Sequence, residues 1–85
     1  KRMPYISPEQ RAPLEEYIQP LADRIHTRGE LNYVITRLIM DRLGEPTYSK
    51  LEQAMGVLEC AKQELYRKVA GKYEDMKCVE NGEVY

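Results

Sequence analysis

Residues 30–70, ELNYVITRLIMDRLGEPTYSKLEQAMGVLECAKQELYRKVA, contain the pattern that decides the fold. Apolar side chains recur at the three-and-four spacing of a helix face on both sides of the break Gly44-Glu45-Pro46-Thr47. The apolar residues are Leu31, Val34, Ile35, Leu38, Ile39 and Leu43 before the break, and Leu51, Met55, Leu58, Leu65 and Val69 after it. A connection this short joins antiparallel helices, so the pattern predicts a long helical hairpin.

A shorter helix is expected before the hairpin. Ser7 can cap its first amides, and Gln10 is placed to complete a capping box. Pro13 interrupts soon afterwards, so the main part of this helix is expected to start there, after one preliminary turn. Pro20 lacks an amide and predicts a kink, and Gly29 is expected to close the helix as a C-terminal cap or turn.

The second helix is expected over about 30–43 and the third from Thr47 to at least Ala70. Asn81-Gly82 is a strong signal for a two-residue turn, so residues 78–85 read either as a miniature hairpin or as a coil with one turn. The sequence therefore predicts one all-α domain over 1–85. A short kinked N-terminal helix packs on a long antiparallel helical hairpin, followed by a short C-terminal turn or mini-hairpin tail.

The composition excludes several classes of protein. Thirteen Lys and Arg residues against fourteen Asp and Glu residues leave a formal net charge of −1, which argues against a nucleic-acid binder or a binder of anionic membranes. No apolar run is long enough to span a membrane, and the start has no signal-peptide pattern. We therefore expect a cytoplasmic protein, in the bacterial host cytoplasm if a phage encodes it.

Neither a metal site nor a catalytic site is indicated. Cys60 and Cys78 are too sparse for a disulfide framework or a zinc site, and His26 is the one histidine. The acidic pairs 15–16 and 74–75 are adjacent in sequence and point to different helix faces. No glycine-rich phosphate loop is present. We expect a protein that is not an enzyme and has no cofactor or metal.

Lys62 is the anomaly on the apolar face of the third helix. Helical spacing places it among Leu51, Leu58 and Leu65. A lysine in such a place snorkels to water, pairs with an acid or binds an anion. In an antiparallel hairpin its expected neighbour is the start of the second helix, near Glu30.

Two alternatives follow for Lys62. In the simpler one, Lys62 pairs with Glu30 and closes the open end of the hairpin. In the other, Lys62 and Arg28 neutralise a phosphate-bearing ligand, and free backbone amides near Glu30 donate hydrogen bonds to it. Tyr66 and Tyr73 share the face of Lys62 and would then stack a base or line the pocket.

A separate candidate surface lies on the second helix. Tyr33 and Arg37 are one turn apart, Met40 follows, and Tyr and Arg dominate the energetics of protein interfaces. Packing between these side chains within the helix is the alternative. Because the second helix carries more apolar surface than one hairpin can cover, a homo-oligomer is expected.

A helix-turn-helix is a further alternative, since a short break containing Gly44 joins two helices. The reading helix would begin at Thr47, where Lys50 is the one basic residue, and the third helix is longer than that motif uses. DNA binding is therefore a minor alternative.

The segments Gly29-Glu30-Leu31-Asn32-Tyr33-Val34-Ile35-Thr36-Arg37-Leu38, Leu51-Glu52-Gln53-Ala54-Met55-Gly56-Val57-Leu58 and Asn81-Gly82-Glu83-Val84-Tyr85 resemble a family of small uncharacterised proteins from bacteria and their phages. The resemblance covers most of the chain after residue 29. The expected architecture is also similar to that of the phage anti-CBASS and anti-Thoeris sponges. Those oligomers sequester cyclic nucleotide signals without cleaving them. No motif matches theirs residue by residue, so none of their binding residues is carried over.

Two functions are therefore expected. The first is a small non-enzymatic binding protein that sequesters a nucleotide-derived, phosphate-bearing signal molecule, as a phage counter-defence sponge does. The alternative is an oligomeric protein–protein adaptor without a small ligand. Likeness of architecture alone does not decide between them.

Overall fold

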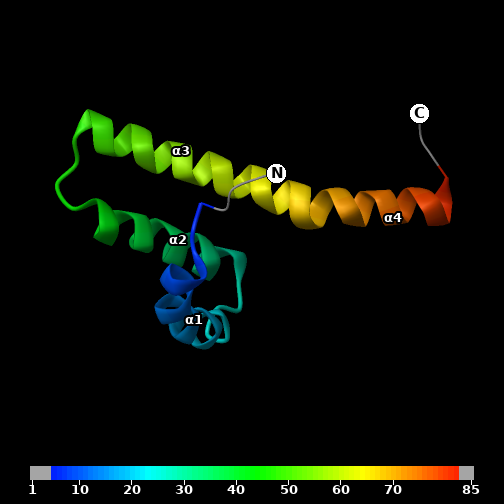
Figure 1. Cartoon of the computed structure of the whole chain (residues 1–85), viewed down its shortest axis with the longest axis horizontal. Helices are drawn as coiled ribbons and strands as arrows, with labels where there is room; N and C mark the ends of the chain where they lie inside the picture. Colours follow the sequence, from blue (N-terminus) through cyan, green and yellow to red (C-terminus); the bar gives the residue numbers. More distant parts are fainter. Residues whose placement is uncertain (1–4, 83–85) are drawn as a thin grey trace. The chain divides into compact units, whose positions relative to one another are not determined.

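The structure is a computed structural model that describes residues 5–82. Within this range the chain forms helices and no strand, which confirms the all-α prediction. Figure 1 shows their order along the chain, and the elements are α1 (Pro8–Ala22), α2 (Arg28–Leu43), α3 (Tyr48–Leu65), the π-helix η1 (Tyr66–Ala70) and α4 (Gly71–Asn81). The chain divides into two units, Lys1–Leu38 and Ile39–Tyr85, and each is described by itself.

In the first unit, α1 starts at the predicted cap. Ser7 Oγ accepts a hydrogen bond from the Gln10 amide at 3.2 Å, and Gln10 Oε1 accepts one from the Ser7 amide at 2.9 Å. The expected preliminary turn before Pro13 is wrong, because one helix runs through Pro13 and Pro20. The capping box anchors the helix at Pro8, and each proline costs it only one backbone bond.

The boundary between α1 and α2 also differs from the prediction. α1 ends at Ala22, and Thr27 begins α2 instead of ending α1. Thr27 Oγ1 accepts a hydrogen bond from the Glu30 amide at 3.0 Å, which is the geometry of an N-terminal cap. Gly29 therefore lies in the first turn of a helix and does not serve as a C-terminal cap.

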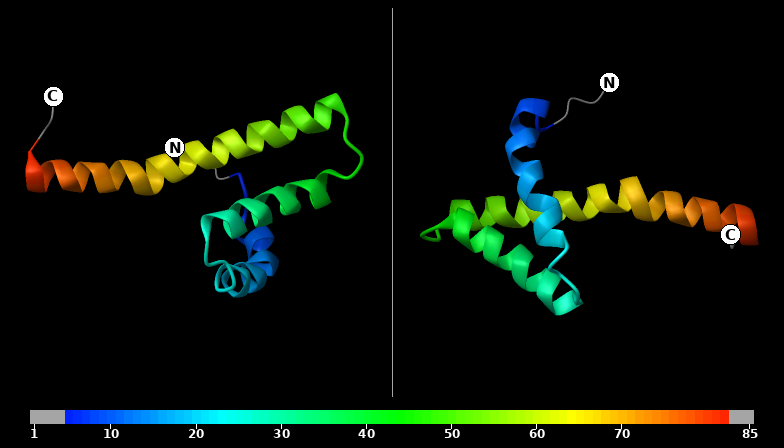
Figure 2. Two further views of the ribbon diagram at one scale, coloured as in Figure 1. Left: turned by 180° about the vertical axis from the view of Figure 1, so that it is seen from behind. Right: turned by 90° about the horizontal axis from the view of Figure 1, so that it is seen from below.

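In the second unit, α3, η1 and α4 form one uninterrupted rod, visible in both views of Figure 2. Thr47 caps it as predicted, since its Oγ1 accepts from the Lys50 amide at 3.2 Å. At the end of η1 the Gly71 amide donates to the carbonyl of Tyr66, five residues earlier instead of four. A turn of this kind takes one residue more than an α-helical turn, and the sequence analysis did not foresee it.

The predicted first strand of a C-terminal hairpin is wrong, because Cys78 and the residues up to Asn81 are helical. Gly82 has a φ of 87° and its amide donates to the carbonyl of Cys78 at 2.8 Å, so it ends α4 as a C-terminal cap. The predicted second strand, residues 83–85, lies outside the described residues.

Neither unit closes a core of its own among the described residues. No residue in this range is buried, and the half-buried ones are few. They are Ile6, Ser7, Ile25 and Val34 in the first unit, and Ile39, Leu43, Ala54, Glu64, Ala70, Gly71 and Cys78 in the second. Large apolar side chains therefore remain exposed on every α-helix.

Candidate functional site

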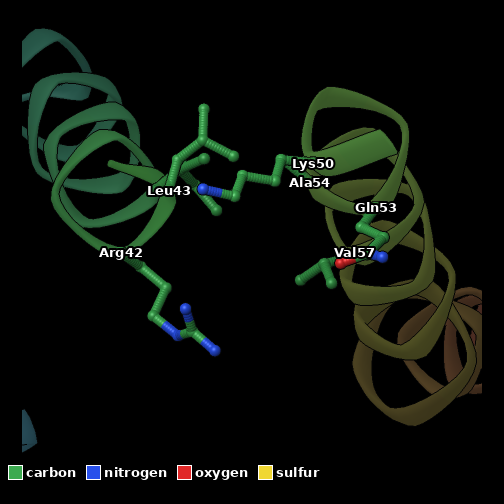
Figure 3. Close-up of a pocket in the computed structure, with 7 residues that line it drawn as sticks. Arg42, Leu43, Lys50, Gln53, Ala54 and Val57 are labelled. Atoms are coloured by element: carbon green, nitrogen blue, oxygen red, sulfur yellow. The ribbon is translucent and has the colours of Figure 1, made fainter. Parts of the chain in front are cut away.

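A groove lies between the last turn of α2 and the first turns of α3, within the second unit. Its volume is about 420 Å³. Figure 3 shows side chains from both helices facing the space between them. The lining residues are Ile39, Arg42 and Leu43 from α2, and Lys50, Gln53, Ala54 and Val57 from α3.

The loop between the two helices shapes one end of this groove. Gly44 has a φ of 70°, which a glycine adopts without strain, so α2 ends sharply there. Lys50 Nζ donates a hydrogen bond to the carbonyl of Glu45 at 3.2 Å, which ties α3 to the loop. In Figure 3 the Lys50 side chain extends from α3 toward Leu43.

The groove combines an apolar lining with positive charge. Ile39, Leu43 and Ala54 are half-buried there, while Arg42 and Lys50 supply two cations. None of the seven lining residues is acidic. A groove of this chemistry fits an amphipathic segment that carries both apolar and acidic side chains.

The sequence analysis missed this groove. Arg42 lies in the last turn of α2, where a cation complements the helix dipole. Val57 was not singled out from the sequence, and Gln53 and Ala54 were not linked to a groove. The available signal was that Lys50, Ala54 and Val57 follow one another at helical spacing beside the break.

The predicted anion pocket at the start of α2 is already filled by an acidic side chain. Glu30 Oε1 accepts hydrogen bonds from the amides of His26, at 2.6 Å, and Thr27, at 3.0 Å. With the Thr27 hydroxyl, this completes a capping box. The amides that were to hold a phosphate therefore bind the carboxylate of Glu30, while Arg28 is the exposed first residue of the helix.

Lys62 has its acidic partner one turn earlier in its own helix. Its Nζ lies 3.7 Å from Glu59 Oε2, and the Lys62 side chain is 77% exposed. This pair is an exposed i,i+3 contact of small energy. The pairing of Lys62 with Glu30 stays a prediction.

The two tyrosines predicted to stack a base are engaged with charged neighbours. The Tyr66 hydroxyl donates a hydrogen bond to Glu74 Oε1 at 2.7 Å. This bond, and the negative charge of Glu74, raise the pKa of Tyr66 above its usual value. Lys77 Nζ lies 5.6 Å from the ring centroid of Tyr73, a cation–π contact.

The residues of the predicted interface on α2 are brought together in part. Arg37 Nη1 donates a hydrogen bond to the Tyr33 hydroxyl at 2.9 Å, and its guanidinium carbon lies 5.9 Å from the Tyr33 ring centroid. Met40 is exposed one turn further along the helix. The packing within the helix and the exposed patch therefore coexist, because the contact holds Tyr33 and Arg37 at the surface.

A second hollow of about 450 Å³ lies along the rod, lined by Cys60, Gln63, Tyr66 and Arg67. Both Cys60 and Cys78 are free thiols. Over residues 5–82 the side chains form no group of three potential metal ligands. In the same part of the chain, no helix combines the length and apolar character needed to cross a membrane.

Comparison with known proteins gives one match. The family described as "Domain of unknown function (DUF6899)" matches residues 3–84, almost the whole chain. No curated protein and no solved structure matches the chain.

Proposed function

We propose that this chain, which belongs to the family described as a domain of unknown function (DUF6899), is a non-enzymatic adaptor that assembles with itself and binds a second polypeptide. The family membership agrees with the resemblance to a small uncharacterised family. It assigns no activity, so the proposal depends on the surfaces of the helices.

The observation that carries the proposal is the exposure of apolar side chains along the helices. Met55 is 67% exposed and Leu65 is 63% exposed. Burying one side chain of this kind is worth about 1.5–3 kcal/mol, so several together supply a large driving force for association. A chain without a buried residue over 5–82 gains this energy by contact with other polypeptide surfaces.

Two surfaces are suited to a second polypeptide. On α2, the hydrogen-bonded pair of Tyr33 and Arg37, extended by Met40, has the composition of an interface hot spot. In the second unit, the groove flanked by Arg42 and Lys50 suits an acidic amphipathic segment. Binding at either surface requires no chemical step.

Sequestration of a nucleotide-derived signal is the weaker alternative. It requires free amides at the start of α2. The amides of His26 and Thr27 are not free, because they donate hydrogen bonds to the carboxylate of Glu30. It also requires Lys62 to face a ligand, and Lys62 pairs with Glu59. A counter-defence role in a phage depends on that ligand and stays a prediction.

Two measurements separate these functions. Light scattering over a dilution series should give a mass above that of one chain, and the melting temperature should rise with protein concentration. Nucleotides and cyclic dinucleotides should leave the melting temperature unchanged. A monomer at all concentrations would contradict the adaptor, and a nucleotide shift that Lys62→Ala abolishes would establish the alternative.

The matched variants for the surface on α2 are Tyr33→Ala and Tyr17→Ala. Tyr33→Ala should weaken binding of a polypeptide partner, because it removes the ring and the acceptor of Arg37. Tyr17 is an exposed tyrosine of α1 outside this patch, so its replacement should leave binding intact.

A further inference from the structure

The rod carries a narrow apolar line, here called the α3 stripe, that nothing in its own unit buries. Successive members are spaced alternately by four and three residues, the pattern of a coiled-coil seam. The members are Leu51, Met55, Leu58, Lys62 and Leu65 in α3, and Val69 in η1. All the apolar ones are exposed.

The α3 stripe is symmetric about Cys60. Leu58 and Lys62 lie two residues to either side of it, and Met55 and Leu65 lie five to either side. The remaining members, Leu51 and Val69, lie nine to either side. Alternating four-and-three spacing reads alike in both directions, so the α3 stripe is compatible with a two-fold antiparallel interface, in which each residue meets a different residue of the same surface.

We propose that the α3 stripe pairs with the α3 stripe of a second copy of this chain, with the two helices antiparallel and the two-fold axis near residue 60. This inference rests on the proposed self-assembly and specifies its interface. Met55 of one copy then packs against Leu65 of the other, and Leu58 against Lys62. Small side chains at Ala54 and Ala61 flank the seam and allow close approach.

The charges at the centre of this pairing are complementary. Lys62 lies 3.7 Å from Glu59 of its own chain, and it would sit beside Leu58 and Glu59 of the second copy. Two ammonium groups and two carboxylates then share the centre. A single polar position in a seam of this kind fixes the register and orientation of the helices at some cost in affinity.

The native thiols do not lie at this interface. Cys60 is two residues from both Leu58 and Lys62, which places it roughly 200° around the helix from each. The two copies of Cys60 would therefore face away from one another although the axis passes near them. This gives the experiment an internal control.

Disulfide formation between single-cysteine variants tests the proposal. In the full chain with Cys60→Ser and Cys78→Ser, one variant carries Met55→Cys and the other Leu65→Cys. Mixed and oxidised, they should form a covalent heterodimer, because the two positions are in contact. Either variant alone should form none, since like positions lie about 15 Å apart along the axis. The control, Cys78→Ser with Cys60 retained, should also form none.

The other outcomes are distinct. Disulfides within each single variant would show a parallel pair and overturn the proposal. An oligomer by light scattering without the mixed disulfide would overturn this interface and leave self-assembly intact. A monomer would overturn both.

Discussion

The hydroxyl of Tyr66 and the carboxylate of Glu74 are joined by a 2.7 Å hydrogen bond that spans the π-helical turn from η1 into α4. They are eight positions apart in sequence, about twice the spacing of neighbouring turns. The bond therefore ties the first residue of η1 to α4. Its donor is the protonated phenol, so it depends on pH.

The first prediction concerns the ionisation of Tyr66. The pKa of Tyr66 is raised, first by the hydrogen bond to Glu74 and then by the charge of that carboxylate. Glu74→Gln should lower this pKa, as followed by the ring signals of Tyr66 in an NMR titration. Asp75→Asn should lower it less, because Asp75 acts only through its charge and is the smallest cause. An unchanged pKa in Glu74→Gln would contradict the bond.

The sign of the effect on stability follows from linkage. A raised pKa means that the folded state holds the phenol proton more tightly than the unfolded state. The stabilisation is therefore complete below the ordinary value of 10.0 and is lost as pH rises through the raised pKa. Tyr66→Phe should remove this pH dependence of the helical circular-dichroism signal.

A second prediction compares two glycines of the rod. A Cβ added at Gly56 meets nothing within 4 Å, so Gly56→Ala should stabilise the chain by roughly 0.5–1 kcal/mol. A Cβ at Gly71 would lie 3.2 Å from the carbonyl oxygen of Tyr66. Gly71→Ala should therefore give less stabilisation or none. Urea unfolding of both variants measures the difference, and equal gains would show that the π turn does not constrain residue 71.

A third prediction concerns the start of α2. Thr27→Ala removes the oxygen that accepts from the Glu30 amide, and it should cost about 1 kcal/mol of stability. Ser49→Ala is the control, since Ser49 lies within the first turn of α3 and not at its cap. Thermal unfolding followed by circular dichroism measures both. A cost in Ser49→Ala as large as that in Thr27→Ala would show that the cap is not the cause.

The fourth prediction concerns the centre of the proposed seam. Lys62→Leu should tighten self-association by about tenfold or more, because it replaces a cation with an apolar side chain in the seam. Lys62→Glu should weaken self-association, because it leaves only carboxylates there. Arg67→Glu is the control. It changes the net charge by as much as Lys62→Glu does, at a position two residues beyond Leu65 and away from the α3 stripe. Sedimentation or light scattering should show it assembling like the parent chain.

The features predicted correctly from the sequence are those that local chemistry decides. Ser7 and Thr47 cap helices because a hydroxyl at that place satisfies free amides, whatever the rest of the chain does. The break after Leu43 was also predicted, because Gly44 and Pro46 both disfavour a continued helix.

Two of the wrong predictions concern glycines, which occur both in turns and at the ends of helices. Gly82 has the positive φ expected of a turn glycine, but this conformation ends α4 and does not turn a hairpin. Gly29 was read as the end of one helix, while Thr27 and Glu30 made it part of the next. The contact of Lys62 with Glu59 was not foreseen, because Glu59 lies three residues earlier on the same helix and off the apolar pattern that singled out Lys62.

The extra residue in η1 affects the direction in which the side chains of α4 point relative to those of α3. Because the π turn takes up one extra residue, the residues after it lag by one residue's rotation, ~100°. Met76, which regular helical counting from Leu65 would place on the α3 stripe, therefore lies off that line. A second copy bound along the α3 stripe would therefore not cover Met76. Deletion of one residue from this turn would restore a regular α-helix without rotating α4, because the π turn is what accommodates that residue.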